Sequence, residues 1–269
     1  MIDYHIHLER GKYTDSWFDR FIKVGKERGI EEFGFVEHLY IFTEASHLLY
    51  QNEHVLSMQN KSIDEYFDFL RSKQAGNNIK IGIEVDYIEE REDQIYSFVK
   101  DLDVDFLIGS VHYLKDWAFD LDKNWPTDNY EKVYCEYYET LLKLAKSNIF
   151  DILGHPGNIA YFGYGPSKEI EEDIVKDFYE KLAKEDIVLE INSGGLYRPA
   201  KRIFPQQKWF DYIHKKGIQV TVSSDAHNPE NVGYAINNEV VPALKSAGYT
   251  HLVSFNKRKK QFKPITVHK

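Results

Sequence analysis

Residues 80–88 read Lys80-Ile81-Gly82-Ile83-Glu84-Val85-Asp86-Tyr87-Ile88, and the charged stretch Glu89–Lys100 follows directly. A short run rich in β-branched residues predicts a strand, and a longer charged stretch behind it is typical of a helix. A strand followed by a helix is the unit of folds in which parallel strands are joined by crossover helices. This stretch therefore predicts one βα unit.

The same unit occurs seven times along the chain, which favours repeated βα units over separate sheets and bundles. The expected strands are Ile2–Leu8, Glu32–Leu39, Lys80–Ile88, Phe106–Leu114, Phe150–Gly154, Ile187–Ser193 and Gln219–Ser224. The expected helices are Asp15–Arg28, Ile63–Lys73, Glu89–Lys100, Asn129–Ser147, Lys168–Lys184, Gln206–Lys216 and Pro229–Ser246. Ser or Asp precedes the helices at Ile63, Asn129 and Lys168, where a short side chain can accept hydrogen bonds from free N–H groups.

Length and composition predict a single α/β domain. The 269 residues are 42% hydrophobic, enough for one large core, and barrels often reach this size as one domain. A net charge of −9 gives no support to nucleic acid or an anionic membrane as a partner. The lone Cys135 cannot form an intrachain disulfide, residues 1–5 lack the features of a secretory signal, and no apolar run is long enough to cross a bilayer. We therefore expect a cytoplasmic protein.

The C-terminal part contains a basic run, Lys257-Arg258-Lys259-Lys260. Such a run can bind nucleic acid or act as a targeting signal, but most charge runs are solvated surfaces. Because the chain around it is acidic, we expect a solvated terminal face here.

Residue types that bind metal ions occur at the carboxyl end of nearly every expected strand. They are His5, His7, His38, Glu84, His112, His155, Asp225 and His227. Barrel enzymes build their active sites at this end of the strands. Residues two apart, as in the pairs His5/His7 and Asp225/His227, point to the same side of an extended chain. A mixture of imidazole and carboxylate ligands suits Zn, Mn or Fe.

Each of these residues taken alone also has a structural explanation. A histidine such as His112 or His155 is more often a core residue with one hydrogen-bond partner than a metal ligand. Glu84, however, lies in an apolar run with no adjacent Lys or Arg, and an unpaired carboxylate is costly to bury there. A shared metal site explains all the residues together, whereas the structural explanation needs a separate reason for each.

Several motifs resemble, in the same order, those of the polymerase-and-histidinol-phosphatase (PHP) superfamily: His5-Ile6-His7, Glu37-His38, Gly82–Tyr87, Gly109–His112, Gly154–Pro156 and Ser224–His227. Within that superfamily, the segments 82–87, 117–120 and 189–199 resemble the monofunctional histidinol-phosphate phosphatases most closely. The resemblance covers nearly the whole chain. It implies a distorted (β/α)7 TIM-like barrel, a trinuclear metal centre, and hydrolysis of L-histidinol phosphate to L-histidinol and phosphate in histidine biosynthesis.

The resemblance also implies how the ligands divide among three cations. One cation would be bound by His5, His7, Glu84 and Asp225, and Glu84 would bridge to a second bound by His112 and His155. His38 and His227 would bind the third, and Asp225, His227 and His38 are also the expected catalytic residues.

One position departs from the family pattern. Many superfamily members have a further histidine six residues after the second histidine of the His-X-His pair, and Tyr13 occupies that position here. Glu9, Asp15 or Glu37 could complete the third site instead, or the site could bind its cation weakly.

Other residues have supporting roles in this interpretation. Arg198 could contact the phosphate with a bidentate guanidinium, or be an ordinary surface arginine. Glu190 and Asn192 could orient the metal-binding imidazoles, although a core hydrogen-bonding role is at least as common for Asn192. The loops 40–61 and 115–128 are long for βα connections and would recognise the rest of the substrate, through Glu44, His47, Asp120 or Asp122.

The main expectation is a phosphomonoesterase that acts on a small molecule, with neither nucleic acid nor a membrane as partner. One alternative keeps the metal centre but places a nucleotide or nucleic-acid end in it. Another is a metal-binding module without catalysis, which is less favoured because the site residues come from several strand ends around one cavity, as in catalytic barrels.

Overall fold

The computed structural model describes residues 1–265, and seven parallel strands at its centre form one sheet. In sheet order they are β1 (Ile2–Ile6), β2 (Glu32–Phe35), β3 (Ile79–Asp86), β4 (Phe106–Ser110), β7 (Ile152–Leu153), β8 (Val188–Asn192) and β9 (Val220–Ser223). The backbone N–H of His7 donates to the Ala226 carbonyl at 2.8 Å, and that of Ala226 donates to the His5 carbonyl at 3.1 Å. These bonds join the ends of β1 and β9, so the sheet nearly closes into the expected distorted barrel.

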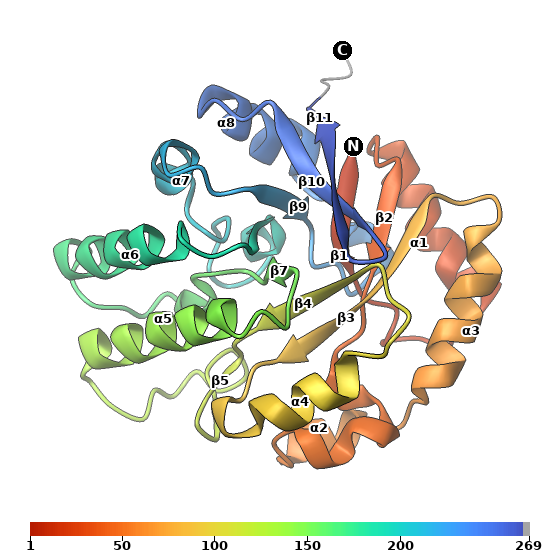
Figure 1. Cartoon of the computed structure of the whole chain (residues 1–269), viewed down its shortest axis with the longest axis horizontal. Coiled ribbons are helices and arrows are strands. Elements are labelled where there is room, and N and C mark those ends of the chain that lie inside the picture. Colours follow the sequence, from red (N-terminus) through yellow and green to blue (C-terminus); the bar gives the residue numbers. More distant parts are fainter. Residues whose placement is uncertain (266–269) are drawn as a thin grey trace.

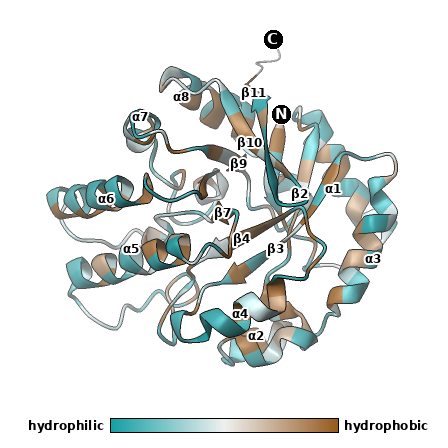
Figure 2. Cartoon of the chain, viewed as in Figure 1, coloured by the Kyte–Doolittle hydropathy of each residue, from teal (hydrophilic) through white to brown (hydrophobic). Residues whose placement is uncertain are grey.

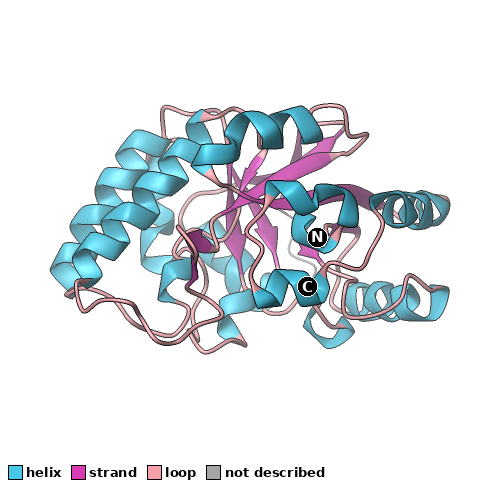
Figure 3. Ribbon diagram, turned by 90° about the horizontal axis from the view of Figure 1, so that it is seen from below, coloured by secondary structure: helices cyan, strands magenta, loops and turns pink. Residues whose placement is uncertain are grey.

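Helices surround the strands (Figures 1 and 3). They are α1 (Asp15–Glu27), α2 (Glu53–Met58), α3 (Ile63–Gln74), α4 (Glu92–Val99), α5 (Tyr130–Lys146), α6 (Lys168–Leu182), α7 (Phe210–Lys215) and α8 (Val241–Ser246). Figure 2 shows hydrophobic residues concentrated on the central strands, whereas the helices have mixed character because only one face of each is buried. Within residues 1–265, no helix is both long and apolar enough to cross a membrane.

All seven expected strands are present, but the expected strand Phe106–Leu114 is too long. β4 ends at Ser110, and Tyr113–Leu114 (β5) instead pairs antiparallel with Trp117–Ala118 (β6). The short hairpin satisfies backbone groups of a segment that has left the parallel sheet. His112 lies between β4 and β5, where the chain turns away from the barrel.

Three expected helices begin later than predicted. The segment Pro229–Ser246 is not one helix, because Gly233 (φ 67°) and Ala235 (φ 56°) adopt left-handed conformations and α8 begins only at Val241. Short 3₁₀ turns precede α4 and α7, which start at Glu92 and Phe210. Composition predicts that these segments are helical, but not where a left-handed residue interrupts them.

Of the three expected capping residues, one has the predicted role. Ser167 Oγ accepts a hydrogen bond from the Ile170 N–H at 3.5 Å, but at α5 the capping residue is Asn129, one position after the expected Asp128. The side chain of Ser62 accepts no capping bond at the start of α3. Glu44 accepts from the Ile63 N–H instead, so this carboxylate of a distant loop has a structural role.

The sequence did not predict a C-terminal hairpin formed by β10 (His251–Asn256) and β11 (Lys259–Pro264). Its turn carries the basic run, which lies at the surface as expected, with Lys257 and Lys259 exposed, but three of its four residues also form ion pairs. Lys257 pairs with Asp103, Arg258 with Asp151 (Nε to Oδ2, 2.8 Å) and Lys260 with Asp186. These acidic residues precede β4, β7 and β8, so the hairpin lies at the amino ends of the strands.

Candidate metal centre

The expected metal ligands come together at the carboxyl ends of the strands. His5 lies in β1, Glu84 in β3, and the others follow the ends of β1, β2, β4, β7 and β9. The side chains of His5, His7 and Glu84 are at most 1% exposed, and all the others except the half-buried His227 are buried as well. Parallel strands end at the same edge of a barrel, so residues up to 222 positions apart meet there.

A first group of ligand atoms surrounds one oxygen of Glu84. Glu84 Oε2 lies 3.1 Å from His5 Nε2 and 3.5 Å from His7 Nε2. The same nitrogen of His7 lies 3.8 Å from Asp225 Oδ1. These are the four residues expected around the first cation.

A second group surrounds the other oxygen of Glu84. Glu84 Oε1 lies 3.0 Å from His155 Nε2 and 3.6 Å from His112 Nε2, and the two imidazole nitrogens are 3.2 Å apart. The two oxygens of Glu84 therefore face different groups of histidines, which is the arrangement of a bridging carboxylate. His38 Nε2 is also close to Glu84, 3.1 Å from Oε2.

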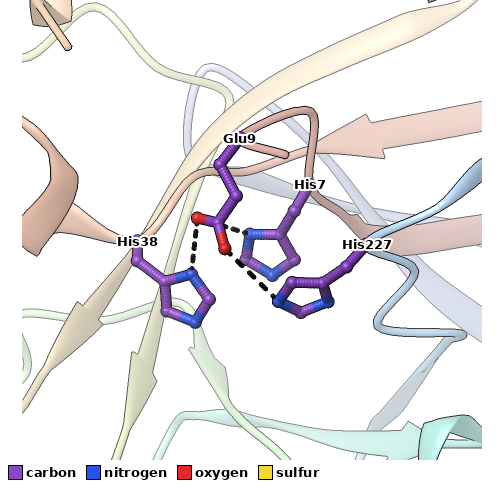
Figure 4. Close-up of side chains that lie close together, drawn as sticks. All are labelled: His7, Glu9, His38 and His227. Atoms are coloured by element: carbon purple, nitrogen blue, oxygen red, sulfur yellow. Dashed lines mark hydrogen bonds and ion pairs between the residues drawn. The ribbon is translucent and has the colours of Figure 1, made fainter. Parts of the chain in front are cut away.

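A third group contains His7, Glu9, His38 and His227 (Figure 4). Glu9 Oε2 lies 2.9 Å from His38 Nδ1, and Glu9 Oε1 lies 3.6 Å from His227 Nε2. The carboxylate of Glu9 thus lies between the two histidines expected at the third cation.

The other two candidates are not members of this group of four, although Glu37 lies beside His7. Asp15 is exposed and pairs with Lys73 Nζ at 2.5 Å. Glu37 accepts a hydrogen bond from the Leu8 N–H, and its Oε2 lies 3.8 Å from His7 Nδ1. Glu9 is therefore the acidic residue that the fold brings to the third group.

Acidic residues also orient two of the imidazoles, by contacting the ring nitrogen that faces away from Glu84. Glu190 Oε1 lies 2.7 Å from His5 Nδ1, as expected, and Asp86 Oδ1 lies 2.6 Å from His112 Nδ1. A carboxylate on one ring nitrogen sets the tautomer and turns the other nitrogen toward a metal. The sequence interpretation missed this role of Asp86, although its position two residues after Glu84 places it on the same side of β3.

Several buried polar atoms of the cluster make no hydrogen bond within the described residues. They include His5 Nε2, both ring nitrogens of His7, and Glu84 Oε2. A buried polar atom without a partner is destabilising unless another group satisfies it. Divalent cations would satisfy these converging nitrogens and oxygens, so the residues fit a metal centre.

The protonation states divide the candidate ligands into two sets. Burial lowers the pKa of His5, His38 and His112, but the neighbouring carboxylates raise it above the ordinary value, so a cation would displace a proton from these rings. The second set is already in the form that binds metal. Burial and the nearby His227 and His38 hold the pKa of His7 well below its ordinary value, and burial lowers the pKa of His227 to about 4. Burial raises the pKa of Glu84, but His5 and His38 outweigh this effect and hold it well below its ordinary value. At neutral pH His7 and His227 are therefore neutral and Glu84 is ionised, as metal ligands must be.

Comparison with known families agrees with this geometry. The family model described as PHP domain matches residues 3–194, and the model described as PHP-associated matches residues 207–239. The chain belongs to the PHP family. The resemblance inferred from the sequence motifs is thereby confirmed.

Similar PHP proteins include a probable histidinol-phosphatase of Deinococcus radiodurans, 28% identical over 214 residues, which are 76% of this chain and 79% of the relative. The histidinol-phosphatase of Bacillus subtilis is 26% identical over 87% of this chain and 96% of its own length. The crystal structure of histidinol phosphate phosphatase from Lactococcus lactis, complexed with Zn, L-histidinol and phosphate, matches with a TM-score of 0.76 at 23% identity. That match covers 97% of this chain and 98% of the other, and it confirms the fold.

In this PHP protein, members of all three groups line a cavity of about 580 Å³, whereas His5 and His7 lie behind its wall. Arg198 reaches it, but its guanidinium pairs with Asp225, with Nη1 2.7 Å from Oδ2 and Nη2 2.8 Å from Oδ1. Arg10 and Lys61 also line the cavity and were missed from the sequence. Arg10 had one visible signal, since it is a basic residue three positions after the His-X-His pair.

Of the four loop residues expected to recognise substrate, only Asp120 lines the cavity. Glu44 is bound to the start of α3, and the ring of His47 lies against that of Phe98 outside the cavity. Asp122 is exposed and accepts from the Asn124 N–H at 2.9 Å.

Proposed function

We propose that this PHP protein is a histidinol-phosphatase, a metal-dependent phosphomonoesterase that hydrolyses L-histidinol phosphate to L-histidinol and phosphate. The observation that carries the proposal is the convergence of six histidines and three carboxylates at the carboxyl end of the barrel, beside one cavity. The names of the relatives, several of them histidinol-phosphatases, support the choice of substrate.

The proposal includes three divalent cations, of Zn, Mn or Fe. His5, His7, Glu84 and Asp225 would hold the first, and Glu84, His112 and His155 the second. His38, His227 and Glu9 would hold the third, with Glu9 in place of the family histidine that Tyr13 replaces. Such cations supply positive charge that offsets the charge of phosphoryl oxygens, and they lower the pKa of water.

The chain's own residues bind and orient the phosphate group. Arg198 lies beside Asp225 on the cavity wall, where its remaining N–H donors can contact phosphate oxygens. Asp225, His38 and His227 line the same cavity and remain the proposed catalytic residues. The surrounding barrel limits access of solvent to one side of the site.

The nucleic-acid alternative receives no support from the basic run. Lys257, Arg258 and Lys260 each pair with an acidic residue, and they lie at the end of the barrel opposite to the cavity. A nucleic acid bound there would have to displace these ion pairs and would not reach the metal centre.

The test combines elemental analysis of the purified protein with a panel of phosphomonoesters that includes L-histidinol phosphate. We expect release of phosphate from L-histidinol phosphate, loss of activity with chelators, and a loss of orders of magnitude in Asp225→Asn and His7→Ala. Circular dichroism should show an intact fold, and Asp122→Asn, which removes an exposed carboxylate outside the cavity, should keep full activity. Near-wild-type rates in both site variants would refute the assignment.

A further inference from the structure

Asp120 is a half-buried carboxylate on the wall of the cavity, in the long loop that follows β6. No hydrogen bond or ion pair to its side chain is present among residues 1–265. A carboxylate that is partly removed from water without a partner is destabilising, and it favours the binding of a cation.

The other acidic residues that line the cavity are already engaged. Glu9 lies 2.9 Å from His38 Nδ1, Glu84 contacts several histidines, and Asp225 pairs with Arg198. Asp120 is therefore the acidic lining residue whose charge is available to a ligand.

The basic residues of the same cavity do not pair with Asp120. Arg198 is paired with Asp225, and Lys61 Nζ donates to the Gly11 carbonyl at 2.6 Å. Arg10 donates to the side-chain oxygen of Asn228 at 2.8 Å, with the amide turned toward it. The three basic side chains of the cavity therefore each contact a group other than Asp120.

The charge of Asp120 acts near the end of the cavity where phosphate would bind. His112 and His155 of the second metal group line the same cavity as Asp120. Burial raises the pKa of Tyr161, another lining residue, and Asp120 raises it further. Asp120 therefore lies within electrostatic reach of the second metal group as well as of the cavity wall.

We infer that Asp120 binds a positively charged amine of the substrate and so selects phosphomonoesters that carry an ammonium group a few bonds from the ester oxygen. The inference rests on the proposed phosphomonoesterase activity and adds a specificity-determining residue to it. The phosphate end would bind at the metal groups and Arg198, and the ammonium would bind at Asp120.

In L-histidinol phosphate the amine is the group that fits this role. An aliphatic amine is fully charged at neutral pH, whereas an imidazole with a pKa of about 6.5 is mostly neutral. The amine is also closer to the phosphate than the imidazole is, which matches a carboxylate that lines the same cavity as His112 and His155. The imidazole is left for the rest of the wall, where Tyr40 and His54 lie.

The test measures kcat/KM of the metal-loaded full chain on two matched pairs of substrates. The first pair is L-histidinol phosphate and 3-(imidazol-4-yl)propyl phosphate, which lacks only the amine. The second pair is O-phosphoethanolamine and propyl phosphate. We expect the wild type to prefer the amine member of a pair by about 10- to 100-fold, the usual range for a hydrogen bond to a charged partner.

Asp120→Asn should reduce this preference to about 1, because kcat/KM falls for the amine substrate and stays unchanged for the other. The control is Asp116→Asn, which removes an exposed carboxylate from the turn of the β5–β6 hairpin and should keep the preference. An equal loss on both members of a pair would show a structural role and overturn the inference. A wild type without preference in either pair would overturn it as well.

The same data separate this inference from the proposed function. Hydrolysis of O-phosphoethanolamine that depends on Asp120, without hydrolysis of L-histidinol phosphate, would support the amine site and refute the histidinol-phosphatase proposal. Hydrolysis of both histidinol-type substrates at equal rates would support a phosphatase and refute the amine site.

Discussion

Two of the candidate ligands show how the cluster is organised residue by residue. The Nδ1 atoms of His5 and His112 lie against Glu190 and Asp86, and their Nε2 atoms lie near Glu84. An imidazole held in this way loses little rotational freedom when it binds a cation, and its basicity rises. The carboxylates behind the histidines are therefore as much a part of the site as the ligands.

Glu190→Gln should weaken metal binding by about 10- to 100-fold, because it keeps the size of the side chain but removes the charge behind His5. Glu190 also accepts a hydrogen bond from the backbone N–H of His155, so it positions residues of two metal groups. Competition with a fluorescent chelator would measure the change. Glu65→Gln, an exposed glutamate on α3, is the matched control. Unchanged affinity in Glu190→Gln would contradict the orienting role.

Glu9→Ala should leave one cation fewer per chain, because Glu9 is the carboxylate between His38 and His227. Elemental analysis after dialysis would count the ions. Asp15→Asn changes an exposed residue that was an equal candidate from the sequence, and it should leave the metal content unchanged. If both variants bind as much metal as the wild type, Glu9 is not a ligand.

Among the elements, the C-terminal hairpin stabilises the end of the barrel away from the site. Phe255 of β10 is fully buried against Tyr4 and Phe106, with ring centroids 6.3 Å apart in each pair. Tyr4 Oη also accepts from the Phe255 N–H at 2.9 Å. The hairpin thus packs on the side chains of β1 and β4, and it forms ion pairs with the residues that precede β4, β7 and β8.

Arg258→Ala should lower the free energy of unfolding by about 1–2 kcal/mol, because Arg258 contacts both Asp151 Oδ2 (2.8 Å) and the Ile149 carbonyl (2.5 Å). Urea denaturation followed by circular dichroism would measure the loss. Lys259 is exposed on the same turn, and Lys259→Ala should change stability by less than about 0.5 kcal/mol. Equal stability of the two variants would show that the ion pair is not stabilising.

For the molecule as a whole, the barrel collects buried histidines and carboxylates, and several of their polar atoms have no hydrogen-bond partner within residues 1–265. His7 Nε2 and Glu84 Oε2 are examples. A cation that binds the folded chain and not the unfolded chain stabilises the fold in proportion to the logarithm of its concentration relative to Kd.

Removal of metal with a chelator should therefore lower the Tm by roughly 5–15 °C, corresponding to a few kcal/mol of binding free energy. Differential scanning fluorimetry would measure the shift, and addition of Zn or Mn should reverse it. A chelator already saturated with zinc controls for effects of the chelator itself. The same Tm with and without metal would contradict a buried metal centre.

The sequence predicted the large-scale order of the fold and the types of ligand. Strand and helix patterns depend on residues within a few positions, so all seven strands could be predicted together with the histidine or carboxylate that ends six of them. The left-handed conformation of Ala235 and the hairpin over 251–264 could not be predicted from local patterns, because they depend on contacts with distant segments.

What the sequence alone determined was thus the repeated βα unit and the placing of histidines and carboxylates, the residue types that bind metals, at the ends of the strands. Only the tertiary structure decided which acidic residue joins His38 and His227, namely Glu9. It also decided that Arg198 pairs with Asp225, and that Asp120 lines the cavity without an ion-pair partner among the described residues. The physical reason is distance along the chain. His5 and Glu190 are 185 residues apart and meet only because the barrel brings β1 and β8 to one cavity, which no local pattern records.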